Sequence, residues 1–262
     1  MMTTSQRELL TGNQAAAEGA IRAGCRFYAG YPITPQNDLP EYMAGRMPEV
    51  GGVFVQAESE LAAISMVHGA AAAGARAMTS SSSPGISLKQ EGMSYLCASE
   101  LPMVIVNVQR AGPGLGDVRC AQADYWQATR GGGHGDYFHL VLAPYSVQET
   151  MDLTIEAFAL AAKWRSPVLL LSDQQVGQMM EPVTLPPMAD ATLPDPPWAL
   201  TGATNGRPRH IVHSYCGRPG ELIEWNKRLK AKWERMAAEE VRWEEFETDD
   251  AELVLLAYGT SA

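Results

Sequence analysis

Short apolar runs alternate with longer helical patterns from about residue 12 to residue 177, and this alternation limits the possible folds more than any other feature. The apolar runs cover residues 27–30, 53–56, 76–79, 103–107, 140–142 and 168–171. Helical patterns cover residues 13–23, 58–73, 85–99 and 147–164. Because neighbouring parallel strands are joined by crossovers that are usually helices, the pattern predicts an α/β fold: a doubly wound parallel sheet covered on both faces.

Ligands of such sheets bind beyond the carboxyl ends of the strands. We therefore expect four segments to lie near one another, namely residues 30–36, 56–60, 80–85 and 109–116. The first domain is predicted to span residues 1–181.

The pattern changes after Met180, where prolines at 182, 186, 187, 194, 196 and 197 interrupt any regular element. Residues 182–250 are therefore predicted to form a proline-rich linker followed by a charged helix at 221–247. The sparse apolar stripe of that helix predicts packing against a neighbouring surface. Residues 251–262 resemble a buried strand followed by a glycine turn. We therefore expect this segment to be the first strand of a truncated second α/β domain.

Composition narrows the class of partner. Twenty basic and thirty acidic residues give a formal charge of −10, which disfavours nucleic acid and anionic membranes. No apolar run approaches the roughly 20 residues that span a bilayer, and the start lacks a signal-peptide core, so a cytoplasmic protein is expected. The cysteines are widely separated and form no CxxC pair, which predicts reduced thiols and neither an iron–sulfur cluster nor a zinc site in this chain.

Two segments carry candidate site residues at strand ends. The string GYPITP at residues 30–35 presents the Thr34 hydroxyl on a rigid turn suited to an anionic substrate, although Thr34 could instead cap the following helix. Glu58, Ser59 and Glu60 open a helix that is apolar on nearly every face. A carboxylate there is either buried, with a tuned proton affinity, or a solvated first-turn acid beside a Ser59 cap.

Three further segments are weaker candidates. SSSSPG at 80–85 allows a close backbone approach to a ligand or is a plain turn. Arg110, in QRAGPGLG, could hold a carboxylate through two hydrogen bonds or could pair locally with Asp117. The segment GGGHGDY at 131–137 carries His134 and Asp136, and a mobile loop that covers substrate or meets a partner is favoured over a metal site.

In combination, GYPITP, QAESELAAISMVHGA, TSSSSPGISLKQEG, VNVQRAGPGLG and GGGHGDY resemble the alpha subunit of the 2-oxoacid:ferredoxin oxidoreductases, especially the 2-ketoisovalerate type. The likeness extends through GRPRHIVHS to AELVLLAYGTSA. The resemblance implies the pyrimidine-binding domain of a thiamine diphosphate enzyme. It also implies a beta subunit that binds the diphosphate and its Mg²⁺, a ferredoxin-like subunit with 4Fe-4S clusters, and coenzyme A and ferredoxin as reactants.

The resemblance also assigns roles to residues. Glu60 matches the glutamate that hydrogen-bonds the aminopyrimidine ring, Thr34 and Arg110 match contacts to the 2-oxoacid, and Tyr31 and Pro32 belong to the same substrate and cofactor turn. Metal ligands are expected only on partner subunits.

Three alternatives stay open. The 2-oxoacid could be branched-chain, pyruvate, 2-oxoglutarate or an arylpyruvate. The chain could be a non-catalytic assembly subunit in which Glu60 only caps a helix. A nucleotide-binding Rossmann domain is disfavoured, because the GxG follows the fourth strand and no Walker lysine is present.

Overall fold

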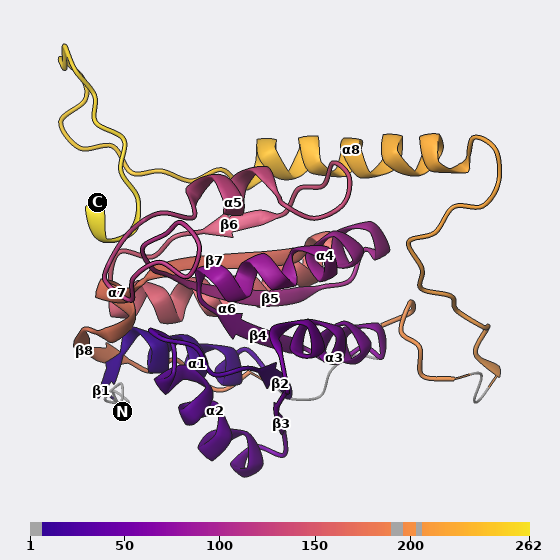
Figure 1. Ribbon diagram of the computed structural model, residues 1–262, viewed down its shortest axis with the longest axis horizontal. Helices are drawn as coiled ribbons and strands as arrows, with labels where there is room; N and C mark the ends of the chain where they lie inside the picture. Colours follow the sequence, from indigo (N-terminus) through magenta and orange to yellow (C-terminus); the bar gives the residue numbers. More distant parts are fainter. Residues whose placement is uncertain (1–6, 190–195, 203–205) are drawn as a thin grey trace, which may run out of the picture.

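The computed structural model describes residues 7–189, 196–202 and 206–262 (Figure 1). Its centre is a six-stranded sheet in which every neighbouring pair is parallel. In sheet order the strands are β3 (Val53–Gln56), β2 (Phe27–Gly30), β4 (Ala77–Ser81), β5 (Met103–Gln109), β7 (Pro167–Asp173) and β6 (Leu140–Leu142). The predicted parallel α/β sheet is confirmed.

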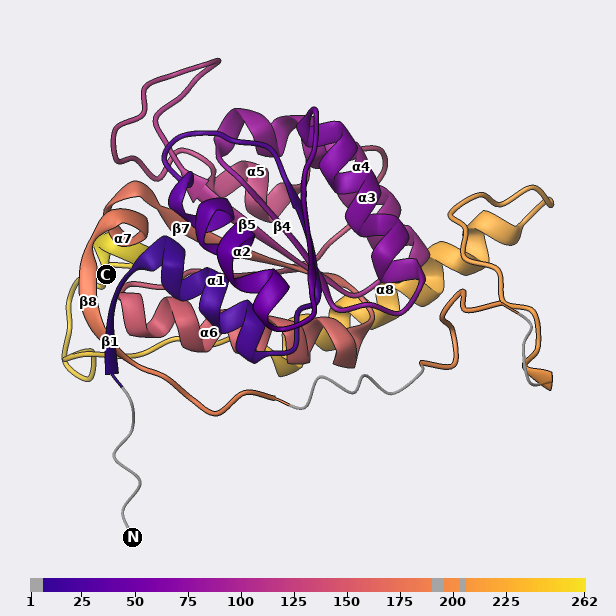
Figure 2. The same cartoon turned by 90° about the horizontal axis from the view of Figure 1, so that it is seen from below.

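Helices cover both faces of this sheet (Figure 2). One apolar core lies under α1 (Gly12–Arg22), α2 (Asp38–Glu49) and α6 (Val147–Trp164). The other lies under α3 (Glu60–Ala72) and α4 (Ser83–Ser99), with α5 (Tyr125–Arg130) beside it. Burial on both faces explains why β5 and β7 read as continuous apolar runs in the sequence.

The strand order reverses direction between β2 and β4. The chain passes from β2 to β3 on one side, and α3 then carries it back across β2 to β4 on the other side. In an open α/β sheet, the carboxyl ends at such a point leave a crevice where ligands bind. The N-terminus of α3 and the turn after β2 both lie at this position.

A small antiparallel ribbon pairs β1 (Arg7–Thr11) with β8 (Met180–Thr184). The expectation that prolines exclude regular structure after Met180 is wrong for this segment, because Pro182 lies within β8 opposite Leu9. Each strand of a two-stranded ribbon has an unpaired outer edge, so a proline can face that edge without breaking the ladder. A short helix, α7 (Gln174–Gln178), precedes β8.

The charged helix α8 spans Glu221–Glu239 and lies beyond β6, on that side of the sheet (Figure 1). Leu229 and Met236 are buried, so the predicted packing against a neighbouring surface is confirmed. The helix ends eight residues earlier than predicted. The helix stops before Glu240, because the carboxylate of Glu240 accepts hydrogen bonds from Lys163 Nζ and Trp164 Nε1, at 2.6 and 2.7 Å.

The expected strand within residues 251–262 is not formed in the described part of the chain. Leu253, Leu255 and Leu256 are exposed, and a single 3₁₀ turn, η2 (Gly259–Ser261), closes the segment. A strand needs a pairing partner, and residues 253–258 have none among the described residues. The turn instead docks on the carboxyl end of β7, where Thr260 Oγ1 donates to Asp173 at 2.6 Å.

Across the described residues, no helix combines the length and the apolar character needed to cross a bilayer.

Candidate active site

Glu58 and Glu60 lie two residues apart at the start of α3 but meet different environments. Ser59 is the N-cap, and its hydroxyl accepts a hydrogen bond from Ala62 N at 3.1 Å. Glu58 is exposed to solvent, whereas Glu60 is only 6% exposed. The interpretation of both acids as solvated first-turn residues therefore holds for Glu58 and is wrong for Glu60, which turns inward toward α4.

A polar cradle surrounds the Glu60 carboxylate at the α3–α4 contact. A Cβ at Gly85 would overlap the Ser81 hydroxyl and lie 2.7 Å from Glu60 Oε1, so only glycine leaves room for the carboxylate. None of the described residues donates a hydrogen bond to that carboxylate, and the buried hydroxyls of Ser81 and Ser82 have no partner among them. Buried polar groups normally have partners, so this cradle has hydrogen-bonding capacity left for a ligand.

Lys89 is a second ionisable group beside this cradle, and the sequence analysis did not single it out. Its side chain is fully buried, and Nζ donates to Thr79 Oγ1 at 2.9 Å. Burial lowers the pKa of Lys89 to about 7, while the charge of Glu60 acts in the opposite direction. The sequence did indicate that Lys89 is buried, because Lys89 follows Ile86 by three residues and precedes Met93 by four, on the apolar face of α4.

Hydrogen bonds from beneath hold the turn after β2 in place. Tyr28 and Ser80 share a hydrogen bond of 2.6 Å between their hydroxyls, and the Ser80 hydroxyl donates to Gln36 Oε1. Asn13 Nδ2 donates to Pro35 O at 2.9 Å. These buried contacts make residues 30–36 a fixed edge of the site.

Within this turn, Thr34 does not cap the next helix. The N-cap of α2 is Asn37, whose Nδ2 donates to Thr34 Oγ1 at 3.1 Å. The interpretation of Thr34 as a cap is therefore wrong. Tyr31 and Pro32 are exposed on the outer surface of the turn, so their side chains are accessible to a ligand.

Arg110 connects the same turn to the loop that follows β5. Its guanidinium is buried and donates from Nη1 to Thr34 O at 2.9 Å and from Nη2 to Leu115 O at 2.8 Å, while Nε has no partner. The alternative pairing with Asp117 is wrong, since Asp117 pairs with Arg119. Within the described residues no carboxylate neutralises Arg110, so a buried positive charge stands ready for an anion.

A buried network supports Arg110 from behind. The Asp124 carboxylate accepts from the Ser83 hydroxyl at 2.6 Å and from Asn107 Nδ2 at 2.9 Å, and Ser83 Oγ accepts from Arg110 N at 2.9 Å. These groups are all nearly inaccessible to solvent. The network fixes the backbone of Arg110 relative to the start of α4.

The glycine-rich segment packs on α4. Tyr137 Oη accepts from Gly132 N and Gly133 N at 3.2 and 3.1 Å, and donates to Gln90 Oε1 at 2.7 Å. A Cβ at Gly133 would overlap Gln90 O. The glycines therefore permit close packing here, while the predicted role as a loop over the substrate stays a prediction. His134 and Asp136 are exposed.

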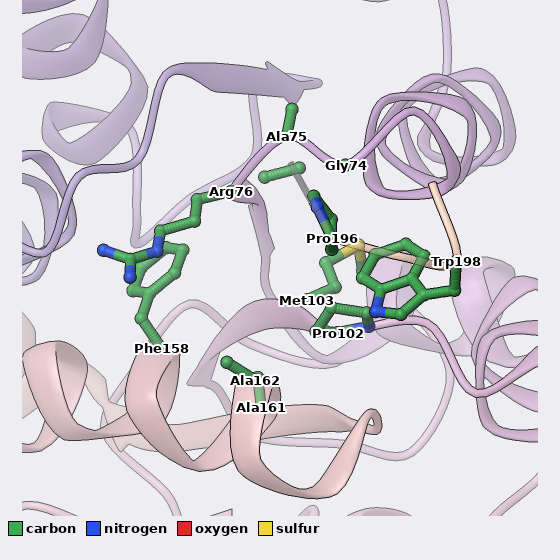
Figure 3. Close-up of a pocket in the computed structure, with 11 residues that line it drawn as sticks. Gly74, Ala75, Arg76, Pro102, Met103, Phe158, Ala161, Ala162, Pro196 and Trp198 are labelled. Atoms are coloured by element: carbon green, nitrogen blue, oxygen red, sulfur yellow. The ribbon is translucent and has the colours of Figure 1, made fainter. Parts of the chain in front are cut away.

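A separate apolar pocket lies at the opposite edge of the sheet, at the amino ends of β4 and β5 (Figure 3). Met103, Phe158 and Trp198 line it, and none of the described lining residues carries a carboxylate. It shares no residue with the cradle around Glu60, so the two features are distinct.

Comparisons with known proteins identify a family for this chain. The family described as pyruvate flavodoxin/ferredoxin oxidoreductase, thiamine diphosphate-binding, matches residues 18–224. The ketoisovalerate oxidoreductase subunit VorB of Methanothermobacter thermautotrophicus is 52% identical over 255 residues, which cover 97% of this chain and 72% of that protein. The 2-oxoglutarate synthase subunit KorA of Archaeoglobus fulgidus is 48% identical over 230 residues, or 86% of this chain and 66% of that protein.

A solved structure is also similar. The 2-oxoglutarate:ferredoxin oxidoreductase from Magnetococcus marinus, with 2-oxoglutarate, coenzyme A and succinyl-CoA bound, superposes with a TM-score of 0.81 at 29% identity. The match covers 92% of this chain and 47% of that one, so the chain spans about half the length of the solved relative. The chain belongs to the thiamine diphosphate-binding family of pyruvate flavodoxin/ferredoxin oxidoreductases.

Proposed function

We propose that this chain is the alpha-type subunit of a 2-oxoacid:ferredoxin oxidoreductase that oxidatively decarboxylates a branched-chain 2-oxoacid to its acyl-CoA and reduces ferredoxin. The 52% identity to a ketoisovalerate oxidoreductase subunit supports the branched-chain substrate. The observation that carries the catalytic role is the burial of Glu60 at the crossover of the sheet, in a cradle with unused hydrogen-bonding capacity.

Glu60 would hold the aminopyrimidine ring of thiamine diphosphate. Its carboxylate accepts no hydrogen bond within the described residues, and the unpartnered Ser81 hydroxyl lies beside it, which fits a ring that carries donors and an acceptor. When bound, the cofactor would supply a carbon nucleophile and an electron sink for decarboxylation of the 2-oxoacid. Glu60 would share or move the proton at the ring nitrogen, and only 6% of this residue is exposed to solvent.

Arg110, Thr34 and Tyr31 would bind the 2-oxoacid, and Pro32 would line the cofactor side of the same turn. The buried Arg110 guanidinium has an unused Nε–H and no described carboxylate partner, so a substrate carboxylate would neutralise it. Because Arg110 also binds Thr34 O, substrate binding and the position of the turn are coupled.

The candidate 2-oxoacids share the same reaction chemistry and differ in their side chains. The 48% identity to a 2-oxoglutarate synthase subunit makes 2-oxoglutarate the second candidate substrate. A panel of purified 2-oxoacids, with pyruvate and an arylpyruvate included, separates the candidates by kcat/KM of the complex. We expect the highest kcat/KM with 3-methyl-2-oxobutanoate, and a preference for 2-oxoglutarate would reassign the substrate.

The remaining components belong to the proposed partners. A beta subunit would bind the diphosphate and Mg²⁺, and a ferredoxin-like subunit would carry the 4Fe-4S clusters. Coenzyme A is bound in the similar solved enzyme, which supports it as the acyl acceptor. For this chain we propose a pyrimidine-binding domain at residues 1–181, followed by a linker and helix at 182–250.

Replacing Glu60 in the purified complex tests the catalytic role. We expect Glu60→Ala to abolish thiamine-dependent release of carbon dioxide, because the ring nitrogen loses its proton partner. Glu58→Ala is the matched control, since Glu58 lies on the same turn but is solvated. Full activity of Glu60→Ala would favour a non-catalytic assembly subunit instead.

A further inference from the structure

Residues 258–261, the tail segment, fold back onto the carboxyl edge of the sheet beside α7 (Figure 2), and the proposed function assigns them no role. Thr260 Oγ1 donates to the Asp173 carboxylate at 2.6 Å, and Thr260 N donates to it at 3.4 Å. Asp173 is the buried last residue of β7, and its carboxylate also accepts from Val176 N at 3.1 Å. The tail segment is therefore anchored on a fixed strand end.

The tail segment also holds the end of the loop that follows β5. Gln122 Nε2 donates to Tyr258 O at 2.6 Å, and Ser261 Oγ donates to Gln122 Oε1 at 2.7 Å. Both polar atoms of the Gln122 side chain are thus bonded to the tail segment. The rings of Tyr258 and Tyr125 pack beside these bonds, with their centroids 5.8 Å apart.

Gly259 permits this close contact. Its φ of +56° lies in the left-handed region, where a side chain would be strained. A Cβ at Gly259 would also lie 3.0 Å from Gln122 Nε2. The glycine therefore suits a segment that packs tightly on the loop.

A buried network leads from the held end of the loop to Arg110. Asp124 lies two residues after Gln122, and its carboxylate accepts from the Ser83 hydroxyl, whose oxygen accepts from Arg110 N. Asp124 N donates to Gln109 Oε1 at 3.0 Å. The last residues of the loop and its first residues are therefore tied together.

The middle of the loop has little support of its own. Residues 112–120 are exposed, and a bridge between Ala111 and Asp117 joins the loop to itself. Leu115 O nevertheless accepts from Arg110 Nη2 at 2.8 Å. The orientation of the guanidinium therefore depends on where the loop lies, and the loop depends on what holds its ends.

We propose that the tail segment, through Thr260 and Gln122, positions Arg110 and its loop to bind the carboxylate of the 2-oxoacid. This inference rests on the proposed function of Arg110. When the tail segment is released, the loop moves and Arg110 loses Leu115 O as a partner. A smaller fraction of the complex is then competent to bind substrate, so the apparent affinity falls while bound substrate still reacts.

Thr260→Val in the purified complex tests the inference, because valine keeps the volume and loses the hydroxyl. We expect KM for 3-methyl-2-oxobutanoate to rise about tenfold, the factor expected for one lost hydrogen bond to a charged group. The kcat at saturating substrate should stay near the wild-type value. Thr260→Ser keeps the hydroxyl and should restore KM. Gln122→Met, which loses both bonds to the tail segment, should raise KM in the same way.

Amide hydrogen exchange provides a second measurement that does not depend on turnover. Residues 111–124 should exchange faster in Thr260→Val and in Gln122→Met than in wild type, because the loop opens more often. Thr248→Val is the matched control, since that hydroxyl also donates to a carboxylate but to that of nearby Glu245. Its KM and its exchange should match wild type.

An unchanged KM in both Thr260→Val and Gln122→Met overturns the inference, whether or not the loop exchanges faster. A loss of kcat with unchanged KM also overturns it, because the substrate would then bind normally. A wild-type complex that turns over no 2-oxoacid refutes the proposed function instead.

Discussion

At the scale of single residues, the site depends on which of two neighbouring acids turns inward. The sequence indicates a helix start at residues 58–60 and the resemblance assigns Glu60, but the pattern alone left its burial open. Burial follows from a long-range contact, because Gly85 on α4 leaves room for a carboxylate arriving from α3. A contact between residues 25 positions apart is not visible in local periodicity.

Gly85→Ala tests this contact. The added Cβ would overlap Ser81 Oγ and crowd Glu60 Oε1, so the carboxylate must move. We expect the affinity of the complex for thiamine diphosphate, measured by calorimetry, to fall at least about tenfold, as misplaced site groups typically cause. Gly69→Ala on α3 is the control, because a Cβ there meets nothing within 4 Å. Unchanged affinity in Gly85→Ala would mean that the cradle does not hold the coenzyme.

Arg110→Lys tests the proposed clamp on the substrate carboxylate. A lysine keeps the charge but loses the planar fork, so we expect KM for the 2-oxoacid to rise about tenfold or more. Arg119→Lys serves as the control, since Arg119 is exposed and pairs with Asp117. Steady-state kinetics of the complex provide the measurement, and an unchanged KM in Arg110→Lys would remove Arg110 from the substrate site.

Lys89 predicts a pH dependence of stability. Burial lowers its pKa from 10.5 to about 7, so between these values the unfolded chain holds a proton that the folded chain has released. The free energy of unfolding therefore rises with pH across this window, by up to about 1.4 kcal/mol per pH unit, and the penalty for burying the charge is present in full below it. In melting experiments from pH 7 to 10, wild type should gain stability relative to Lys89→Met. A constant difference would contradict the shift.

At the scale of elements, patterns of 3.6 and 2 residues located the parallel strands and the helices α1, α3, α4 and α6 to within a few residues, but they gave no bounds for α2. The strands β1 and β8 and the end of α8 depend on partners rather than on their own sequence. β1 and β8 pair with each other although more than 160 residues of chain separate them. Pro182 kept the sequence pattern from indicating a strand at β8. The end of α8 depends on the hydrogen bonds that the Glu240 carboxylate accepts from Lys163 and Trp164.

The junction of β1 with α1 carries an element-scale prediction. The Thr11 hydroxyl accepts from Gln14 N at 3.1 Å and donates to Asp38 Oδ2 at 2.6 Å, which ties the first helix to the second. Thr11→Ala should lower the free energy of unfolding by about 1–2 kcal/mol in denaturant titrations, as lost caps do. Thr129→Ala is the control, because that exposed hydroxyl only bonds a carbonyl of its own helix. Equal effects in the two variants would argue against the cap.

At the scale of the whole molecule, the strand order gathers the candidate residues. Glu60 starts α3, Thr34 follows β2, and Arg110 follows β5, and all three lie at the carboxyl edge of one sheet. The α/β alternation predicted this edge, because parallel strands end together. The resemblance, rather than the alternation, indicated the coenzyme. The network around Asp124 emerged only from the packing of α4, whereas the buried position of Lys89 was indicated by its spacing from Ile86 and Met93 but was not recognised.

The central claim is that Glu60 handles the proton of a thiamine ring anchored by another subunit. Hydrogen–deuterium exchange at the thiamine C2 carbon, followed in the coenzyme-loaded complex, tests this claim most directly. Glu60→Gln should slow the exchange by at least about a hundredfold, the usual contribution of a positioned acid or base, while Glu58→Gln exchanges at the wild-type rate. Wild-type exchange in a Glu60→Gln complex that still binds the coenzyme would contradict the account.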